Sequence, residues 1–122
     1  MVLDVQADLR RRLAEYLAPI SVNVRVPKDR PSEFVVVTRE GGSEINELLD
    51  GPGVAIWCWA DTEERASQIA HSVDRFMHSL KFSDGYTTVL RESMRSSPDI
   101  FTDTPRWYIS YSLITYEPIK ED

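Results

Sequence analysis

Three side chains with metal-binding or proton-transfer chemistry, His71, Asp74 and His78, follow one another at helical spacing. At about 100° per residue of an α-helix, they fall within a sector of roughly 60°. An apolar stripe occupies another side of the same expected helix, so we expect these polar side chains to face solvent. A metal site also usually takes ligands from other segments and orients each histidine through a second hydrogen bond. The spacing therefore favours a polar helix face over a metal centre.

Other reactive residue types lack the context that their chemistry requires. Asp99 and Asp103 could act as paired carboxylates, but they lie in a Ser/Thr/Pro-rich stretch, where Asp commonly accepts hydrogen bonds within turns. Gly41 and Gly42 follow an expected strand, yet neither a helix nor the Lys-Ser/Thr pair of a phosphate-binding loop follows them. Cys58 is the one cysteine and lies in an apolar run, as a buried, inert thiol does. We therefore expect no enzymatic activity, no cofactor and no bound metal.

The composition is that of a folded, acidic chain. Its 122 residues suit a single domain spanning 1–122, and 42% hydrophobic with 28% charged residues argues against disorder. The net charge of −6 is unfavourable for gripping phosphates, so we expect no specific nucleic-acid binding. We see no apolar stretch of signal-peptide or membrane-spanning length, and we expect a soluble protein of a reducing cytoplasm with no membrane partner.

The stretch from Val54 to Leu80 is the centre of the expected fold. Val54–Ala60 is an unbroken apolar run of the length and composition of a strand buried on both faces. Asp61 can cap a following helix, and Glu64 completes a capping-box-like pair. The apolar residues of that helix recur at spacings of three and four: Ala66, Ile69, Ala70, Val73, Phe76, Met77 and Leu80.

The remaining segments add one helix and four strands. One side of the first helix carries Val2, Val5, Leu9, Leu13 and Tyr16, which we expect to be buried. This helix should end at Ala18, because Pro19 disfavours helical geometry in the residue before it. The order α-β-β-β-α-β-β predicts an α+β fold: an antiparallel or mixed sheet of four or five strands with two helices packed on one face. The expected segments are a helix over 2–18 and strands at Val22–Val26, Phe34–Thr38, Val54–Ala60, Thr87–Arg95 and Arg106–Tyr116.

Two of these strands carry large residues on both faces, although the helices can cover only one. Strand alternation places Trp57 and Trp59 on the same face, and it separates Trp107 from Tyr108. The uncovered face would expose Trp and Tyr in a large patch, which monomers rarely tolerate. We therefore expect the protein to associate with itself.

The connection Ser43–Pro52 is polar and carries Glu44, Glu47 and Asp50 without a basic residue. Hairpin loops usually have two to five residues, so a longer one tends to be functional or mobile. We expect this connection to be mobile in a free subunit and to become ordered against a partner.

Three stretches, in order, are similar to a known family. They are PKDRPSEFVVVTREGG (Pro27–Gly42), WCWADTEERASQIAHSV (Trp57–Val73) and SPDIFTDTPRWYISYSLIT (Ser97–Thr115). The first resembles the P-x-x-R-P-x-E-F-V-x-V-x-R-x-G-G stretch of tail terminator, or tail completion, proteins from long-tailed bacteriophages and prophages. The others resemble that family's aromatic strand with its capped helix, and its closing loop and strand. The acidic insert between Glu44 and Asp50 has no counterpart that we can match.

The resemblance implies a structural virion protein of the phage tail, assembled in the bacterial cytoplasm. Such proteins form a ring, typically a hexamer, that caps the tail tube, stops its polymerisation and offers a surface for the head. The implied partners are other copies of the chain, the major tail tube protein and a head-completion protein. We expect the subunit or tube contacts at Arg39, Glu44, Glu47, Asp50, Trp57, Trp59 and Trp107. The three carboxylates would also give an acidic lining to a channel that passes DNA.

Two alternatives remain open at this point. A head–tail connector or neck protein has the same size and ring habit. A small dimeric α+β ligand-binding module could instead hold an apolar ligand against the aromatic sheet face.

Overall fold

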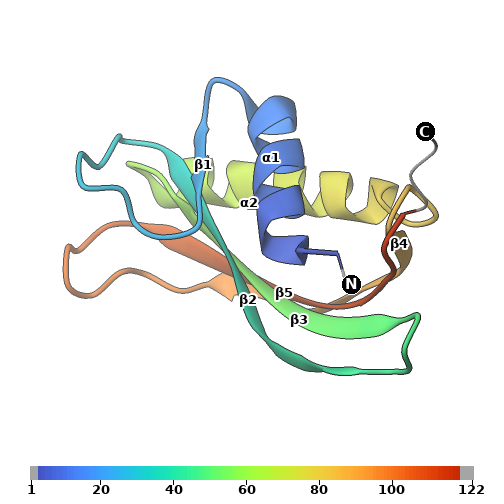
Figure 1. Cartoon of the computed structure of the whole chain (residues 1–122). Coiled ribbons are helices and arrows are strands. Elements are labelled where there is room, and N and C mark those ends of the chain that lie inside the picture. The colour runs from blue at the N-terminus through green and yellow to red at the C-terminus, as the bar shows by residue number, and fades with distance from the viewer. Residues whose placement is uncertain (1–2, 119–122) are drawn as a thin grey trace.

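A computed structural model describes residues 3–118, which form one sheet with two helices packed on one of its faces (Figure 1). This confirms the predicted α+β class and the order of the elements. The elements are α1 (Val5–Leu17), β1 (Ser21–Asn23), β2 (Phe34–Glu44), β3 (Asp50–Trp59), α2 (Glu63–Ser79), β4 (Tyr86–Ser96) and β5 (Arg106–Thr115).

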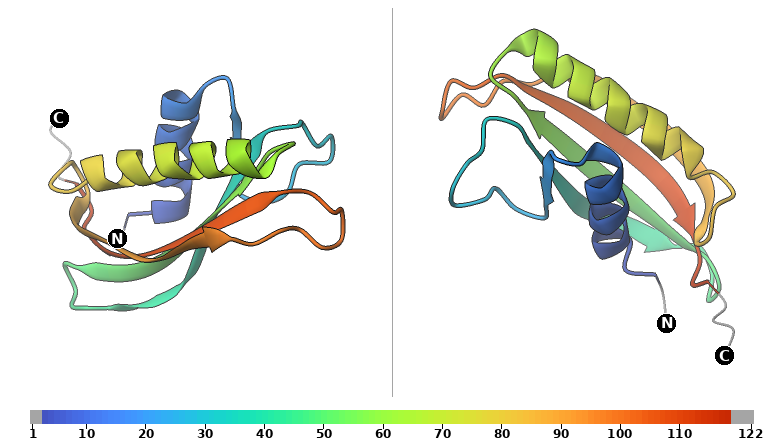
Figure 2. Two further views of the ribbon diagram at one scale, coloured as in Figure 1. Left: turned by 180° about the vertical axis from the view of Figure 1, so that it is seen from behind. Right: turned by 90° about the horizontal axis from the view of Figure 1, so that it is seen from above.

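The sheet has five strands in the order β1-β2-β3-β5-β4. The pairs β2–β3, β3–β5 and β4–β5 are antiparallel, whereas the short β1 lies parallel to β2. The central positions of β3 and β5 explain why these two strands carry large residues on both faces. Figure 2 shows α2 running along the sheet and α1 crossing it at the β1–β2 side.

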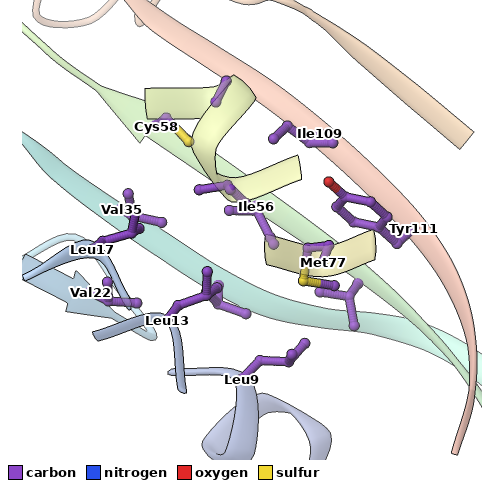
Figure 3. Close-up of a cluster of buried hydrophobic side chains, with 14 of the residues drawn as sticks. Leu9, Leu13, Leu17, Val22, Val35, Ile56, Cys58, Met77, Ile109 and Tyr111 are labelled. Atoms are coloured by element: carbon purple, nitrogen blue, oxygen red, sulfur yellow. The ribbon is translucent and has the colours of Figure 1, made fainter. Parts of the chain in front are cut away.

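The hydrophobic core lies between the helices and the sheet (Figure 3). Val5, Leu9, Leu13 and Leu17 form the buried row of α1 at four-residue spacing. Two buried tyrosines bring polar groups to this face: the Tyr86 hydroxyl donates to Asp8 at 2.6 Å, and the Tyr111 hydroxyl donates to Asp74 at 2.8 Å. The core is therefore apolar at its centre, with tyrosine hydroxyls bonded to carboxylates at its edges.

Two details of the helices differ from expectation. Tyr16, expected on the buried side of α1, is about half exposed, because Leu17 continues the buried row instead; Val2, assigned to the same row, lies outside the described residues. The N-cap of α2 is Thr62 and not Asp61. Its hydroxyl accepts from the Arg65 amide at 3.1 Å, while Asp61 lies exposed one residue earlier.

The strands differ most from expectation in β1 and in the β2–β3 connection. β1 ends at Asn23, and Val26 is exposed instead of continuing the strand. The expected long connection over Ser43–Pro52 is wrong, because Ser43 pairs with Gly51 and Glu44 pairs with Asp50. Only residues 45–49 lie outside the ladder, which is an ordinary hairpin length.

Candidate assembly surface

The sheet face turned away from the helices, here called the open face, carries a second, smaller apolar cluster. Val54, Ile56 and Cys58 of β3 belong to the core under the helices, so the alternate residues Trp57 and Trp59 point to the opposite side. The open face therefore holds both tryptophans, as alternation predicted. Its apolar cluster contains Phe34, Val36, Trp57 and Trp59.

Arginine side chains cover the aromatic rings of the open face. The rings of Phe34 and Trp59 stack with centroids 4.5 Å apart, and Trp57 lies 4.5 Å from Tyr108. The Arg106 guanidinium carbon is 4.5 Å from the ring centre of Trp57 and 5.4 Å from that of Trp59. These distances are those of cation–π contacts.

Two further arginines extend this stack at its ends. Arg95 lies 4.5 Å over Tyr108, and Arg30 lies 5.3 Å over Phe34. We call the resulting set the aromatic–arginine cluster. It consists of Arg30, Phe34, Trp57, Trp59, Arg95, Arg106 and Tyr108.

Asp99 fixes the edge of the cluster from the β4–β5 loop. Its carboxylate accepts from the Trp59 indole N–H at 3.2 Å, from Arg30 at 3.4 Å and from the Phe101 amide at 3.1 Å. Burial alone would raise the pKa of Asp99, but these hydrogen bonds outweigh burial and hold the pKa below its ordinary value. Asp99 therefore makes turn and tryptophan hydrogen bonds, and Asp103 is not paired with it as a second carboxylate would be.

The cluster changes the expectation for the tryptophans. Trp59 is only 3% exposed, because Phe34, Arg30 and Arg106 pack against its ring within the same chain. The expectation that this ring would be bare is wrong, whereas Trp57 keeps part of its surface accessible. Trp107 lies on the helix face, where its indole N–H donates to Glu63 at 2.8 Å. The three tryptophans thus do not form one patch.

The β2–β3 turn forms a compact tip that combines acid with exposed apolar side chains. The Asn46 carboxamide oxygen accepts from the amides of Leu48 and Leu49 at 2.8 and 2.9 Å, which orders the turn. Glu44 and Glu47 are exposed, and so are Ile45 at 49% and Leu48 at 77%. We call these four residues the acidic tip.

Gly42 lets the two strands approach closely at the base of this tip. Its φ is +94°, and a Cβ there would clash with the Gly51 carbonyl oxygen. The pairing shifts register between Arg39 and Gly42, as a bulge does. Any side chain at Gly42 would therefore disturb the base of the hairpin.

Asp50 does not belong with the exposed carboxylates. It is 6% exposed, and one of its oxygens lies 2.9 Å from an Arg39 guanidinium nitrogen. The expectation that it lacks a basic partner is wrong, because the hairpin pairing brings Arg39 back to it across β2 and β3. Arg39 and Asp50 therefore stabilise the hairpin, which leaves Glu44 and Glu47 as the free acids of the tip.

The cluster and the tip lie at opposite ends of the sheet (Figure 2). Phe34, Trp59 and Arg106 face one another across the strands at one end. Glu44, Asp50 and Thr115 do so at the other end. A single chain therefore cannot bring its own tip to its own cluster.

The residues with possible metal chemistry are engaged elsewhere. Asp74 is partly buried, in contrast to the solvent-facing position expected for it, and accepts from Tyr111 and Arg91, both at 2.8 Å, with His78 at 3.3 Å. His71 contacts the Ser67 carbonyl oxygen at 2.7 Å. Among residues 3–118 no group of His, Cys, Asp and Glu side chains could hold a metal ion.

A buried thiol and a hollow between the helices are two further features to compare with the requirements of a site. Cys58 is fully buried, and burial raises the pKa of its thiol. An open hollow of about 440 Å³ lies between the helices, lined by residues that include Tyr16, Phe76 and Glu15. In the part of the chain described, neither helix has the length and apolarity to cross a membrane.

Aromatic rings, guanidinium groups and an acidic, partly apolar hairpin tip are features of contact surfaces more than of catalytic centres. No protein-family model matches this chain, and no curated protein matches its sequence.

Proposed function

We propose that this protein is a tail terminator, a virion protein that caps the end of a phage tail tube as a ring. In this role it stops polymerisation of the tube and offers the surface to which the head joins. The supporting observation is that the three stretches similar to that family converge in the aromatic–arginine cluster. Arg30 and Phe34 come from the first, Trp57 and Trp59 from the second, and Arg106 from the third.

The convergence matters because the three stretches are far apart in sequence. Arg30 and Asp99, which are 69 positions apart, meet at 3.4 Å, and Asp99 also holds the Trp59 indole. Ordinary strand-and-turn patterns would not need to meet in one place. Their meeting supports a resemblance that extends to the packing of the folded chain.

The chemistry of the described residues also suits an assembly role. The strongest candidate groups, Asp74, Asp99 and Cys58, are bonded to structural partners or buried. Exposed apolar side chains instead lie at the turns, where they can enter contacts: Ile45, Leu48, Phe82, Ile100 and Phe101. Asp50 is paired with Arg39 and cannot contribute to an acidic lining of a DNA channel, whereas the exposed Glu44 and Glu47 can either line such a channel or contact a neighbouring subunit.

The test is an assembly assay with the tail tube protein encoded next to this chain. Added during tube polymerisation, the protein should shorten the tubes and appear as a ring of about hexameric mass at one end, seen by negative-stain microscopy and native mass spectrometry. A ring that binds head connectors and leaves tube length unchanged would indicate a neck protein. A dimer that retains an apolar ligand would contradict the proposal and favour the ligand-binding module.

A further inference from the structure

We propose that the acidic tip of one subunit docks on the aromatic–arginine cluster of the next copy of this chain. This inference rests on the proposed function, because it assumes that the protein assembles with itself. It specifies the two surfaces that meet, and it predicts that a different surface of each copy takes part in the contact.

The first argument is charge complementarity between groups that have no partner of their own. Within residues 3–118, neither Glu44 nor Glu47 forms an ion pair, and no basic residue lies between positions 40 and 53. At the other end, Arg95 donates to the Ser93 hydroxyl and Arg106 to the Ser97 carbonyl, and within residues 3–118 neither forms an ion pair, although the charge of Asp99 acts on Arg106. Two acids and two guanidinium groups that form no ion pair among the described residues therefore lie on distant surfaces of an acidic chain.

The second argument is the state of the guanidinium groups. Contacts with the rings of Tyr108 and Trp57 restrain Arg95 and Arg106, so less side-chain freedom is lost when a carboxylate binds. Partial burial and the charge of Arg30 lower the pKa of Arg106 from its ordinary value, although the charge of Asp99 acts in the opposite direction. A carboxylate from outside would relieve that unfavourable environment, and planar guanidinium groups bind carboxylates with two parallel hydrogen bonds.

The third argument is the apolar part of each surface. Ile45 and Leu48 are exposed beside the two acids, and Trp57 and Tyr108 keep part of their rings accessible beside the two arginines. A contact with charged pairs around an apolar centre is the usual anatomy of an interface. Both surfaces offer that arrangement in complementary form.

The fourth argument is geometric. Because the two surfaces lie at opposite ends of the sheet, the contact joins different patches of two copies. Such heterologous contacts generate a closed ring when the rotation between subunits closes, and an open filament when it does not. A face-to-face dimer with its twofold axis parallel to the strands would instead oppose like charges, Arg95 and Arg106 against their own copies. A dimer with its axis perpendicular to the strands would make the tip-to-cluster contact twice, and its mass distinguishes it from a ring.

Single-stranded nucleic acid is the competing occupant, because stacked aromatic rings and arginines also bind bases and phosphates. The net charge of −6 disfavours it, since the rest of the surface repels phosphate. The experiment below therefore includes an oligonucleotide.

The experiment uses two charge-reversed full-length chains. The tip variant carries Glu44→Lys and Glu47→Lys, and the cluster variant carries Arg95→Glu and Arg106→Glu. Each alone opposes like charges at every contact and should associate on the order of tenfold more weakly, or worse, than the unchanged protein. Mixed in equal amounts, they should assemble again with the two chains alternating, because Lys tips then meet Glu clusters and Glu tips meet Arg clusters. Native mass spectrometry, with one chain isotope-labelled, reads the alternation directly.

Matched controls separate folding from docking. Glu15→Lys with Glu64→Lys carries the same charge change on exposed helical positions and should assemble as the unchanged protein does. Since Arg106 packs on two tryptophans, the single exchanges Arg95→Glu and Glu47→Lys, both at exposed positions, repeat the test without disturbing that packing.

The outcomes distinguish this inference from the proposed function. If the unchanged protein forms rings and shortens tubes while the tip variant does the same, the tip-to-cluster contact is wrong and the proposed function stands. If the unchanged protein neither assembles nor affects tubes, both fail. If Arg95→Glu abolishes binding of a fluorescent single-stranded oligonucleotide and leaves assembly intact, the cluster is a nucleic-acid site and the inference is overturned.

Discussion

Both faces of the sheet carry buried apolar side chains, but different groups cover them. On the helix face, α1 and α2 cover aliphatic side chains from all five strands, and polar groups such as the Tyr111 hydroxyl are bonded to carboxylates, whereas the buried Thr115 hydroxyl has no hydrogen-bond partner among the described residues. On the open face no element lies over the rings, and arginines with one carboxylate take that place. The helix face is therefore covered by apolar side chains of the helices, whereas the open face has guanidinium groups at its surface.

This difference lets the open face be covered within one chain and still offer a surface for binding. Long charged side chains can cover apolar surface with their stems while the head stays at the surface. A chain that covers its aromatic face in this way does not need a partner to fold, yet it keeps a charged, partly apolar surface for one. The arginines of the open face thus cover its aromatic rings and also provide charged groups that could contact a partner.

The largest expected effect is a difference in stability between alanine substitutions of the two tryptophans of the open face. Trp59→Ala should lower the free energy of unfolding by about 3–5 kcal/mol, as for a fully buried tryptophan in a core. The loss includes the stack on Phe34 and the hydrogen bond to Asp99. Trp57→Ala should cost roughly half as much or less, because part of its ring is already accessible to water.

Urea denaturation of both variants measures this difference, and Trp59→Phe serves as the control, since it keeps a stacked ring without the indole N–H. Equal losses for the two alanine variants would mean that arginine stacking does not bury Trp59 in solution, and the comparison of the faces would fail.

Much of the helix face could be predicted from the sequence. The three- and four-residue spacing of Ala66, Ile69, Val73 and Met77 indicates one buried stripe, and Pro19 marks the end of α1. Alternation in β5 correctly separates Ile109 and Tyr111 from Tyr108. These patterns are local, because one helix or strand turns its side chains at a fixed period.

The open face could not be predicted in the same way, because its cover comes from distant segments. Nothing near Trp59 in the chain indicates that Arg30, Asp99 and Arg106 will close over it. The pair Arg39–Asp50 was missed for a related reason, since a bulged hairpin brings the two together only after the strands pair. A polar stretch such as Ser43–Pro52 looks like a loop in sequence, but strand pairing extends through glycines there.

The next prediction is that protonation of Asp99, the carboxylate of the open face, lowers the stability of the fold at acid pH. The pKa of Asp99 lies below its ordinary value of 3.8 in the folded chain. The unfolded chain therefore binds the proton more readily, so the stabilisation is fully present above that ordinary value and is lost as the pH falls through the folded pKa. Asp99→Asn should cost about 1 kcal/mol at neutral pH and should flatten the acid limb of the stability curve.

Urea midpoints followed from neutral pH into the acid range measure this effect. Glu33→Gln is the matched control, because the hydrogen bond from Arg65 lowers the pKa of Glu33 at a more accessible site, where solvent weakens the effect. An acid limb unchanged by Asp99→Asn would show that the carboxylate does not hold the cluster together.

The smallest expected effect compares two arginines of β4 that serve different faces. Arg91 pairs opposite Tyr111 and contacts Asp74 at 2.8 Å on the helix side, whereas Arg95 pairs opposite Tyr108 and lies over its ring on the open face. Simple alternation would put positions 91 and 95 on the same face. The register shift between Arg91 and Ser93 changes that, since a bulge adds one residue to one strand.

The two contacts should respond differently to salt. Arg91→Ala and Arg95→Ala should each cost about 0.5–1 kcal/mol, because both side chains are exposed. An ion pair at the surface is screened within about 8 Å at physiological ionic strength, so the cost of Arg91→Ala should shrink as salt rises. The contact of Arg95 with Tyr108 also depends on packing of the guanidinium group against the ring, so the stability lost in Arg95→Ala should persist at high salt.

Urea midpoints of both variants at low and at molar salt measure this difference, and Arg95→Lys is the control that keeps the charge without the planar group. If the cost of Arg95→Ala disappears with salt as that of Arg91→Ala does, Arg95 acts as a charge alone, and the open face is not covered by stacking.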